Sequence, residues 1–249
     1  MTKNAIYTIE TNQPIANDVF AMRLAGPTGA LVAPGQFVNI LLNGFYLRRP
    51  ISVCDWDEAG MLLIYKILGK GTAQMATMQP GQTLNLLTGL GNGFTVSAAT
   101  GKPTVLVGGG VGVPPLFSLA KQLITAGNIP EVVLGFRSSG DVFYAEEFAK
   151  LGCKVHLATE DGTAGTKGFV TTALQDMAYD YYYTCGPNAM LQAVHALSAQ
   201  KGAAGQLSFE ERMGCGFGAC MGCSCHTQVG PKRVCVDGPV FTSEEVVFA

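Results

Sequence analysis

The sequence predicts a β plus α/β protein that carries a small cysteine-rich module at its C-terminal end. Three observations lead to this fold class. The chain has 249 residues, more than one domain usually contains. Its texture then changes twice, from short strand-like segments to alternating strands and helices near residue 100, and to a cysteine-rich tail after residue 205. We therefore expect an antiparallel β-barrel over residues 1–99, an α/β domain with a parallel sheet over 100–205, and a separate module over 206–249.

The first ninety-odd residues contain several short apolar segments separated by Gly, Pro and Asn. They cover residues 6–9, 19–24, 37–42, 51–56, 61–67 and 84–87. Short strands with regular turn signals predict a small antiparallel barrel or sandwich. One short helix is expected to interrupt it, with Thr72 as N-cap and Met75 and Met78 on the inner face.

From residue 104 each predicted strand precedes a predicted helix. The strands cover 104–109, 131–136, 154–159 and 179–186, and the helices 114–124, 144–151, 171–177 and 188–200. Pro114 and Pro115 suit the first turn of a helix. The expected buried faces consist of Leu116, Leu119, Ala120, Leu123 and Ile124 in the first helix and Met190, Ala193, Val194 and Leu197 in the last. This alternation predicts a parallel sheet that binds its ligand at the carboxyl ends of the strands.

Charge and composition restrict the classes of function. Lys and Arg number 16 against 18 Asp and Glu, so no basic surplus is available for a nucleic-acid backbone. We find no secretory signal and no apolar run long enough to span a membrane, and we expect a soluble, cytoplasmic protein. In a reducing compartment the eight cysteines are expected to be metal or redox ligands and buried thiols rather than disulfides.

Four cysteines have the spacing of an iron-sulfur site. Cys215, Cys220, Cys223 and Cys235 follow the pattern C-x4-C-x2-C…C, which is the plant-type [2Fe-2S] ligand pattern. Thiolates suit iron, and small neighbours let backbone N–H groups point at the sulfur atoms. Those small neighbours are Gly214, Gly216, Gly218, Ala219 and Gly222. We predict a [2Fe-2S] cluster.

Two alternatives exist for these thiols. A structural zinc site usually takes its thiolates from two C-x2-C pairs, and only Cys220 and Cys223 form one here. Cys225 is a fifth thiol in the segment and an alternative ligand to Cys223, which we prefer because it completes the spacing.

Two further segments have features of nucleotide sites. In RPIS at residues 49–52, Arg49 suits a flavin diphosphate and Ser52 suits the edge of a flavin ring. An arginine pair at the start of a strand, without any ligand, is an equally good interpretation of these four residues. Gly71 and Thr72 lie in a glycine-rich turn before a helix, a place that binds pyrophosphate.

The turn at 108–113 follows an apolar strand and precedes the helix at Pro114. Gly109, Gly110 and Gly112 give it the context of a dinucleotide-phosphate turn, but it lacks the G-x-G-x-x-G fingerprint, and a plain buried turn is the alternative. Cys185 ends a strand, where it either lies beside a nicotinamide ring or packs in the core. Cys54 and Cys153 are assigned to packing.

The chain resembles the ferredoxin-reductase superfamily in five features taken together. These are RPIS at 49–52, GGGVGVPP at 108–115, GFR at 135–137, CGP at 185–187 and the cysteine-rich tail. The chain is more closely similar to the electron-transfer subunits of NAD-dependent, class 1B dihydroorotate dehydrogenases. The stretches that carry this similarity are RRPIS, IYKILGKGT, EERMGCGFGACMGC and VCVDGPVF. This similarity spans essentially the whole chain.

The resemblance implies FAD in the barrel, NAD as a diffusible substrate on the α/β domain and a [2Fe-2S] cluster in the tail. It also implies an FMN-bearing catalytic partner that oxidises dihydroorotate, in a heterotetramer with two copies of each chain. Electrons would pass from the partner through the cluster and FAD to NAD+. The implied FAD contacts are Arg49, Pro50, Ile51, Ser52, Ile64, Tyr65, Lys66, Gly71 and Thr72, and the implied cluster ligands are Cys215, Cys220, Cys223 and Cys235. Ile51 stands where many superfamily members carry a tyrosine.

Two other functions fit the same motifs. The chain could serve a different complex, of the sulfide dehydrogenase or hydrogenase type, with the same cofactors. It could also be an iron-sulfur redox sensor whose flavin domain is vestigial.

Overall fold

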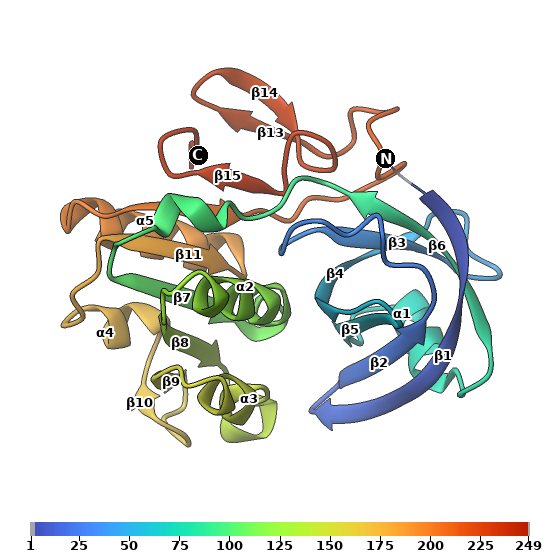
Figure 1. Ribbon diagram of the computed structural model, residues 1–249, viewed down its shortest axis with the longest axis horizontal. Coiled ribbons are helices and arrows are strands. Elements are labelled where there is room, and N and C mark those ends of the chain that lie inside the picture. The colour runs from blue at the N-terminus through green and yellow to red at the C-terminus, as the bar shows by residue number, and fades with distance from the viewer. Residues whose placement is uncertain (1–2, 249) are drawn as a thin grey trace.

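The computed structural model describes residues 3–248. Figure 1 shows a barrel and an α/β layer side by side, with the C-terminal segment lying along one edge of both. This arrangement places the cysteine-rich tail against the barrel as well as against the α/β sheet. Among residues 3–248, no helix is long and apolar enough to cross a membrane.

The N-terminal part is a closed barrel, as predicted. Its strands are β1 (Lys3–Ala16), β2 (Val19–Ala25), β3 (Phe37–Leu41), β4 (Arg49–Trp56), β5 (Gly60–Lys66) and β6 (Thr83–Leu90), paired in the order β1-β2-β5-β4-β3-β6. Every pairing is antiparallel. Alternate residues such as Met22, Val38, Ile40 and Leu63 fill the interior, which is how a small barrel buries its apolar faces.

Helix α1 (Lys70–Thr77) packs onto the barrel through Met75, which is fully buried among the interior side chains. The prediction that Thr72 caps this helix is wrong, because the N-cap residue is Gly69. Thr72 lies in the first turn, where its hydroxyl accepts hydrogen bonds from the N–H groups of Leu68 at 2.9 Å and Gly69 at 3.3 Å. Its side chain therefore reaches back over the turn instead of starting the helix.

The second part is a seven-stranded sheet in the order β10-β9-β8-β7-β11-β12-β15. Its strands are β7 (Thr104–Gly109), β8 (Glu131–Phe136), β9 (Val155–Thr159), β10 (Thr166–Lys167), β11 (Tyr181–Cys185), β12 (Ala204–Ser208) and β15 (Val240–Thr242). The four predicted strands pair in parallel, as expected, and β10 and β12, which were not predicted, join them in parallel. Only β15 runs antiparallel to its neighbour.

Helices α2 (Pro114–Thr125), α3 (Ala145–Lys150), α4 (Val170–Leu174) and α5 (Asn188–Gln200) connect these strands, with short 3-10 turns η1 (Val96–Ala99), η2 (Gly110–Gly112) and η3 (Ser139–Asp141). The helix predicted at 171–177 ends earlier, because the Met177 N–H closes a turn on the Leu174 carbonyl oxygen at 3.2 Å. In α5, Leu191 and Val194 are buried but Ala193 is exposed, so the predicted inner face was wrong at that position.

The C-terminal segment joins both larger parts. Strands β13 (Ser224–Thr227) and β14 (Gly230–Arg233) form a separate hairpin, while β15 returns to the edge of the α/β sheet beside β12. Asn92, which follows the last barrel strand, donates to the Val240 carbonyl oxygen at 2.8 Å and accepts from the Val240 N–H at 3.0 Å. The tail is therefore held by barrel and sheet together.

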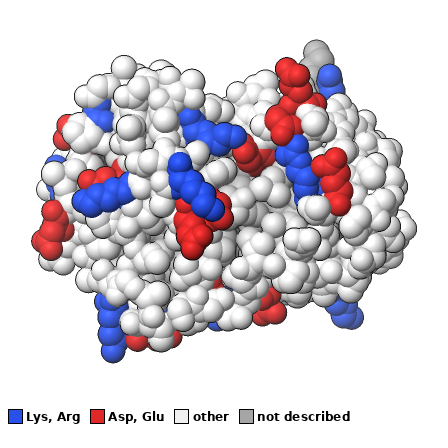
Figure 2. All heavy atoms as spheres, turned by 60° about the horizontal axis from the view of Figure 1, so that its bottom comes forward, with Lys and Arg blue, Asp and Glu red and all other residues white. Residues whose placement is uncertain are grey.

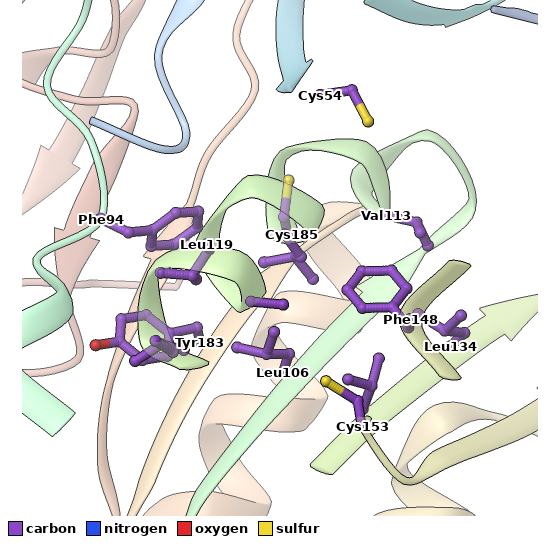
Figure 3. Close-up of a cluster of buried hydrophobic side chains, with 14 of the residues drawn as sticks. Cys54, Phe94, Leu106, Val113, Leu119, Leu134, Phe148, Cys153, Tyr183 and Cys185 are labelled. Carbon is purple, nitrogen blue, oxygen red and sulfur yellow. The ribbon is translucent and has the colours of Figure 1, made fainter. Parts of the chain in front are cut away.

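The barrel and the α/β layer share a hydrophobic core. Val19, Cys54 and Ile64 of the barrel belong to the same buried cluster as Leu119 and Cys153 of the α/β part. Figure 3 shows this cluster, with Cys54 at one side and Tyr183 and Cys153 at the other. Burial of Cys54 and Cys153 confirms their assignment to packing.

The outer surface carries no broad patch of one charge on the face that Figure 2 shows, where basic and acidic side chains lie interspersed. At the seam between the parts, the Lys121 ammonium contacts the Asp55 carboxylate at 2.7 Å.

Candidate functional site

The four cysteines predicted as cluster ligands lie together as two pairs. The Cys220 N–H donates to the Cys215 sulfur at 3.4 Å, and these two side chains also contact each other. The Cys223 and Cys235 side chains form the second contact, and both are almost fully buried, at 1% exposure each. Among residues 3–248, no three His, Cys, Asp or Glu side chains are gathered as ligands of a single metal ion.

Paired thiols suit a two-iron cluster, because each iron of a [2Fe-2S] centre takes two thiolates. The chemistry of the pairs agrees with this. Burial opposes ionisation of Cys215, but the backbone N–H groups of Phe217, Cys220 and Ala219 outweigh it and lower the pKa of Cys215 to about 6. Burial and the neighbouring Cys223 thiol raise the pKa of Cys235 to about 12, so the Cys235 thiol needs bound positive charge to ionise. The residues present therefore fit the cluster.

Cys225 occupies a different position from the paired thiols. It lies on strand β13, opposite Lys232 of β14, and is only half-buried. Burial, with help from the Glu211 charge, raises the pKa of its thiol. The pairs form without it, which favours the spacing-based choice of Cys223.

Sequence reasoning missed Asn39, which touches the loop that carries Cys215. The Asn39 Nδ2 donates to the Cys215 carbonyl oxygen at 3.2 Å. A Cβ atom at Gly216 would lie 2.3 Å from the same Nδ2, so the loop approaches the barrel strand as closely as glycine allows. The available signal was a single amide side chain in the apolar strand FVNILL at residues 37–42.

Two of the predicted flavin residues, Arg49 and Gly71, lie together at the start of β4. Arg49 lies over the Phe45 ring, 4.5 Å from its centroid, and a Cβ atom at Gly71 would come within 2.3 Å of the Arg49 Nε. The first turn of α1 at Gly71 and the Arg49 guanidinium therefore share one small space. A guanidinium beside helix N–H groups is a suitable partner for a diphosphate.

The strand register divides the other predicted flavin contacts between two faces. Pro50 and Ser52 are opposite Asn39 and Phe37 of β3 and, like them, face out of the barrel. Ile51 is opposite Val38 and packs with the barrel interior. The register thus places Ile51 away from the outer face.

Two of the β5 contacts also point away from the Arg49 end. Tyr65 is buried inside the barrel, where its hydroxyl donates to the Asn12 side chain at 2.8 Å. Ile64 belongs to the core shared with the α/β part. Lys66, at the strand end, is half-buried, and Thr72 lies in the first turn of α1.

The predicted nicotinamide residues meet at the carboxyl ends of β7 and β11. Cys185 is the strand partner of Gly108. A Cβ atom at Gly112 would lie 2.3 Å from the Cys185 carbonyl oxygen, and one at Gly109 would lie 2.5 Å from the Met190 sulfur. Gly110 has a φ of +51°, a conformation that glycine adopts without strain. These glycines thus let the turn lie flat against the end of β11.

Cys185 itself is a buried neutral thiol. Burial raises its pKa to about 12, the Glu210 charge acts in the same direction, and a hydrogen bond with Ser208 opposes both. The thiol therefore stays protonated at neutral pH. It is an uncharged side chain at the strand end and does not act as a nucleophile. Glu210 is a neighbour that sequence reasoning missed.

Comparisons with known proteins agree with this geometry. Residues 210–247 match the iron-sulfur cluster binding domain of dihydroorotate dehydrogenase B, and residues 106–196 match an oxidoreductase NAD-binding domain. The dihydroorotate dehydrogenase B (NAD(+)) electron transfer subunit of Geobacillus sp. (strain WCH70) is 44% identical over the full length of both chains. The corresponding subunit of Bacillus caldolyticus is 44% identical over 97% of each chain.

Solved structures show the same architecture. An NADH-dependent reduced ferredoxin-NADP oxidoreductase matches with a TM-score of 0.88 and 31% identity, over 98% of this chain and 90% of that one. A ferredoxin NADP+ reductase from Neisseria gonorrhoeae, solved with FAD and NADP, shares the fold at a TM-score of 0.68 and 16% identity, over 80% of this chain and 92% of that one. By its full-length identity to the curated subunits, this chain belongs to the family of electron transfer subunits of NAD+-dependent dihydroorotate dehydrogenase B.

Proposed function

We propose that this chain carries electrons from dihydroorotate oxidation, performed on a partner subunit, to NAD+. One observation carries the proposal: the loop that carries Cys215 contacts the outer face of β3, through the hydrogen bond from Asn39 to the Cys215 carbonyl oxygen, next to the strand that bears the flavin motif. A [2Fe-2S] cluster passes single electrons, and a flavin combines them into the pair that a hydride needs. In this proposal the residues for both groups lie on neighbouring strands and the loop that contacts them.

The residues have separate tasks in this proposal. Cys215 and Cys220 hold one iron, and Cys223 and Cys235 hold the other. Arg49 and the turn at Gly71 hold the FAD diphosphate.

Pro50 and Ser52 face the flavin from the outer side of β4, and Lys66 and Thr72 border the same end of the barrel. From Ile51, Ile64 and Tyr65, whose side chains point elsewhere, only backbone contacts are proposed.

The nicotinamide site is assigned to the end of β7 and β11. Gly109, Gly110 and Gly112 admit the dinucleotide to the turn, and the buried thiol of Cys185 lies beside the nicotinamide. Hydride transfer requires no ionised side chain, and the raised pKa of Cys185 keeps its thiol neutral.

The oxidation of dihydroorotate is assigned to another polypeptide. The curated relatives are named as subunits, which implies a catalytic partner. We propose that this partner carries FMN and that the complex contains two copies of each chain. The catalytic base for dihydroorotate then lies on the partner.

A second candidate partner has specific support. The 31% identical oxidoreductase that shares nearly the whole fold is described in connection with flavin-based electron bifurcation. A reductase subunit of another complex would use the same three sites on this chain. Only the identity of the partner separates the two functions.

The test is to purify the chain together with whatever co-purifies, under anaerobic conditions. We expect FAD, two irons per chain and a companion polypeptide with FMN. Dihydroorotate should reduce NAD+ with the complex and not with this chain alone. Zinc in place of iron, or dihydroorotate oxidation by the isolated chain, would contradict the proposal.

A further inference from the structure

Strand β3 separates the flavin motif from the cysteine loop. Its residues Val38 and Ile40 point into the barrel, where they belong to the interior cluster. Phe37 and Asn39 point outward, because successive side chains of a strand alternate between faces. Phe37 packs in the same buried cluster as Cys223 and Cys235. The outer face of β3 therefore forms the seat of the cysteine-rich module.

The neighbouring strand places Pro50 and Ser52 of the flavin motif on this same face. Phe37 pairs with Ser52 and Asn39 pairs with Pro50 across the β3–β4 ladder. Directly opposite residues of an antiparallel pair share a face, with Cβ atoms about 5 Å apart. Pro50 and Ser52 therefore each lie directly across the β3–β4 ladder from a side chain that contacts the cysteine-rich module.

Asn39 makes the polar contact across this seam. Its side chain is 1% exposed, and its Nδ2 donates to the carbonyl oxygen of Cys215 at 3.2 Å. Its own carbonyl oxygen accepts from the Arg48 Nη1 at 3.1 Å, which ties the strand at that point. Asn39 is therefore held from the barrel side and grips the loop on the other side.

The buried environment of Asn39 lowers the stability of the fold, which argues against a purely structural role for its amide. Within residues 3–248, its Oδ1 is buried without any hydrogen-bond partner. A buried acceptor without a partner destabilises a fold, and an apolar side chain of the same shape would avoid that cost. The loop is restricted to glycine at the same contact. Gly216 has a φ of +76°, and a Cβ atom there would lie 2.3 Å from the Asn39 Nδ2.

We propose that Asn39 is a positioning residue that fixes the Cys215 loop, and with it the cluster, at a set place beside the flavin strand. This inference rests on the proposed function for the identity of the two cofactors. Asn39 donates from its Nδ2 to the backbone carbonyl oxygen of Cys215, so it acts through Cys215 and takes no part in electron chemistry itself. Its neutral amide donor adds no charge next to the thiolates.

The test compares Asn39→Leu and Asn39→Asp in the complete complex as purified. Leucine has nearly the same shape but cannot donate, and aspartate would face the Cys215 carbonyl oxygen with a second acceptor. Asn92→Ala is the matched control, because it removes a hydrogen-bonded asparagine that holds the same module at Asp237 and Val240 and makes no hydrogen bond to the Cys215 loop.

The first measurement is amide hydrogen exchange over residues 215–220. We expect both Asn39 variants to exchange there about threefold to tenfold faster, the ratio that loss of one ordinary hydrogen bond produces. The second is the electron paramagnetic resonance spectrum of the reduced cluster, whose g values should shift. NADH should also reduce the cluster more slowly in both variants, with an unchanged Kd for NADH. Asn92→Ala should leave the g values and the exchange of 215–220 unchanged.

Unchanged exchange and unchanged g values in Asn39→Leu would overturn the inference. A change of the same size in Asn92→Ala would also overturn it, because general loosening of the module would then explain the result. The cofactor content of the wild-type complex distinguishes the two proposals. A wild-type complex without FAD or iron would refute the proposed function. A wild-type complex with both cofactors, together with an unaffected Asn39→Leu variant, would refute the Asn39 inference alone.

Discussion

Gly112 and Cys185 touch through their backbones, because a Cβ atom at Gly112 would lie 2.3 Å from the Cys185 carbonyl oxygen and 2.4 Å from its carbonyl carbon. This contact joins the turn after β7 to the end of β11, the two strand ends assigned to the nicotinamide. Neither backbone can move without disturbing the parallel pairing between these strands.

Gly112→Ala should therefore destabilise the protein. Backbone atoms cannot move aside as a flexible side chain can, and overpacking of this kind costs about 1–3 kcal/mol. Chemical denaturation should show the loss, and NADH titration should show weaker binding. Gly29→Ala is the control, because a Cβ atom there meets nothing within 4 Å. Equal stability of the two variants would disprove the tight contact.

Gly71→Ala should release flavin without unfolding the barrel. The added methyl group would meet the end of the Arg49 side chain, which can move away but then leaves the diphosphate position. Loss of one charge-assisted hydrogen bond weakens binding about tenfold to a hundredfold. Flavin fluorescence after dialysis measures the retained FAD. Gly69→Ala, two residues earlier and with open space around its Cβ position, should retain FAD as the wild type does.

Replacement of single thiols distinguishes the candidate ligands. Cys223→Ser should abolish the visible iron-sulfur absorption, because Cys223 belongs to a buried pair with Cys235. Cys225→Ser should keep that absorption, because Cys225 lies outside both pairs on strand β13. Iron analysis and absorption spectra of anaerobically purified variants measure the result. A normal spectrum for Cys223→Ser would transfer the ligand role to Cys225.

The ion pair between Glu245 and Lys232 should make the stability of the tail depend on pH. A hydrogen bond from Lys232 is the main reason why the pKa of Glu245 is lowered. A group whose pKa is lower in the folded protein stabilises the fold above its unfolded pKa and loses this effect as pH falls through the folded value.

Glu245→Gln should accordingly reduce stability at pH 7, by less than about 1 kcal/mol because the pair is partly exposed. The difference from wild type should vanish below the folded-state pKa of Glu245. Urea denaturation at several pH values measures it. Glu244→Gln, at the exposed neighbouring position, serves as control and should show no such dependence.

Local patterns in the sequence were sufficient for much of the fold. The strand at residues 104–109 and the helix at 188–200 were predicted with the bounds that the structure has, because long apolar periodicity and flanking glycine or proline act within one segment. The spacing of the cysteines likewise predicted that four thiols would meet. Strand β15 was not predicted, since three residues carry no pattern and become a strand only beside β12.

The sequence by itself determined the short strands of the first part, the alternating strands and helices of the second and the spacing of the cysteines, because those depend on residues that are near one another in the chain. Only the tertiary structure decided that the thiols form two pairs, that Tyr65 points into the barrel, and that Asn39 reaches Cys215 across 176 positions of sequence. Such contacts depend on strand register and on the docking of one part against another. Both follow from packing over the whole molecule, and no single segment contains that information.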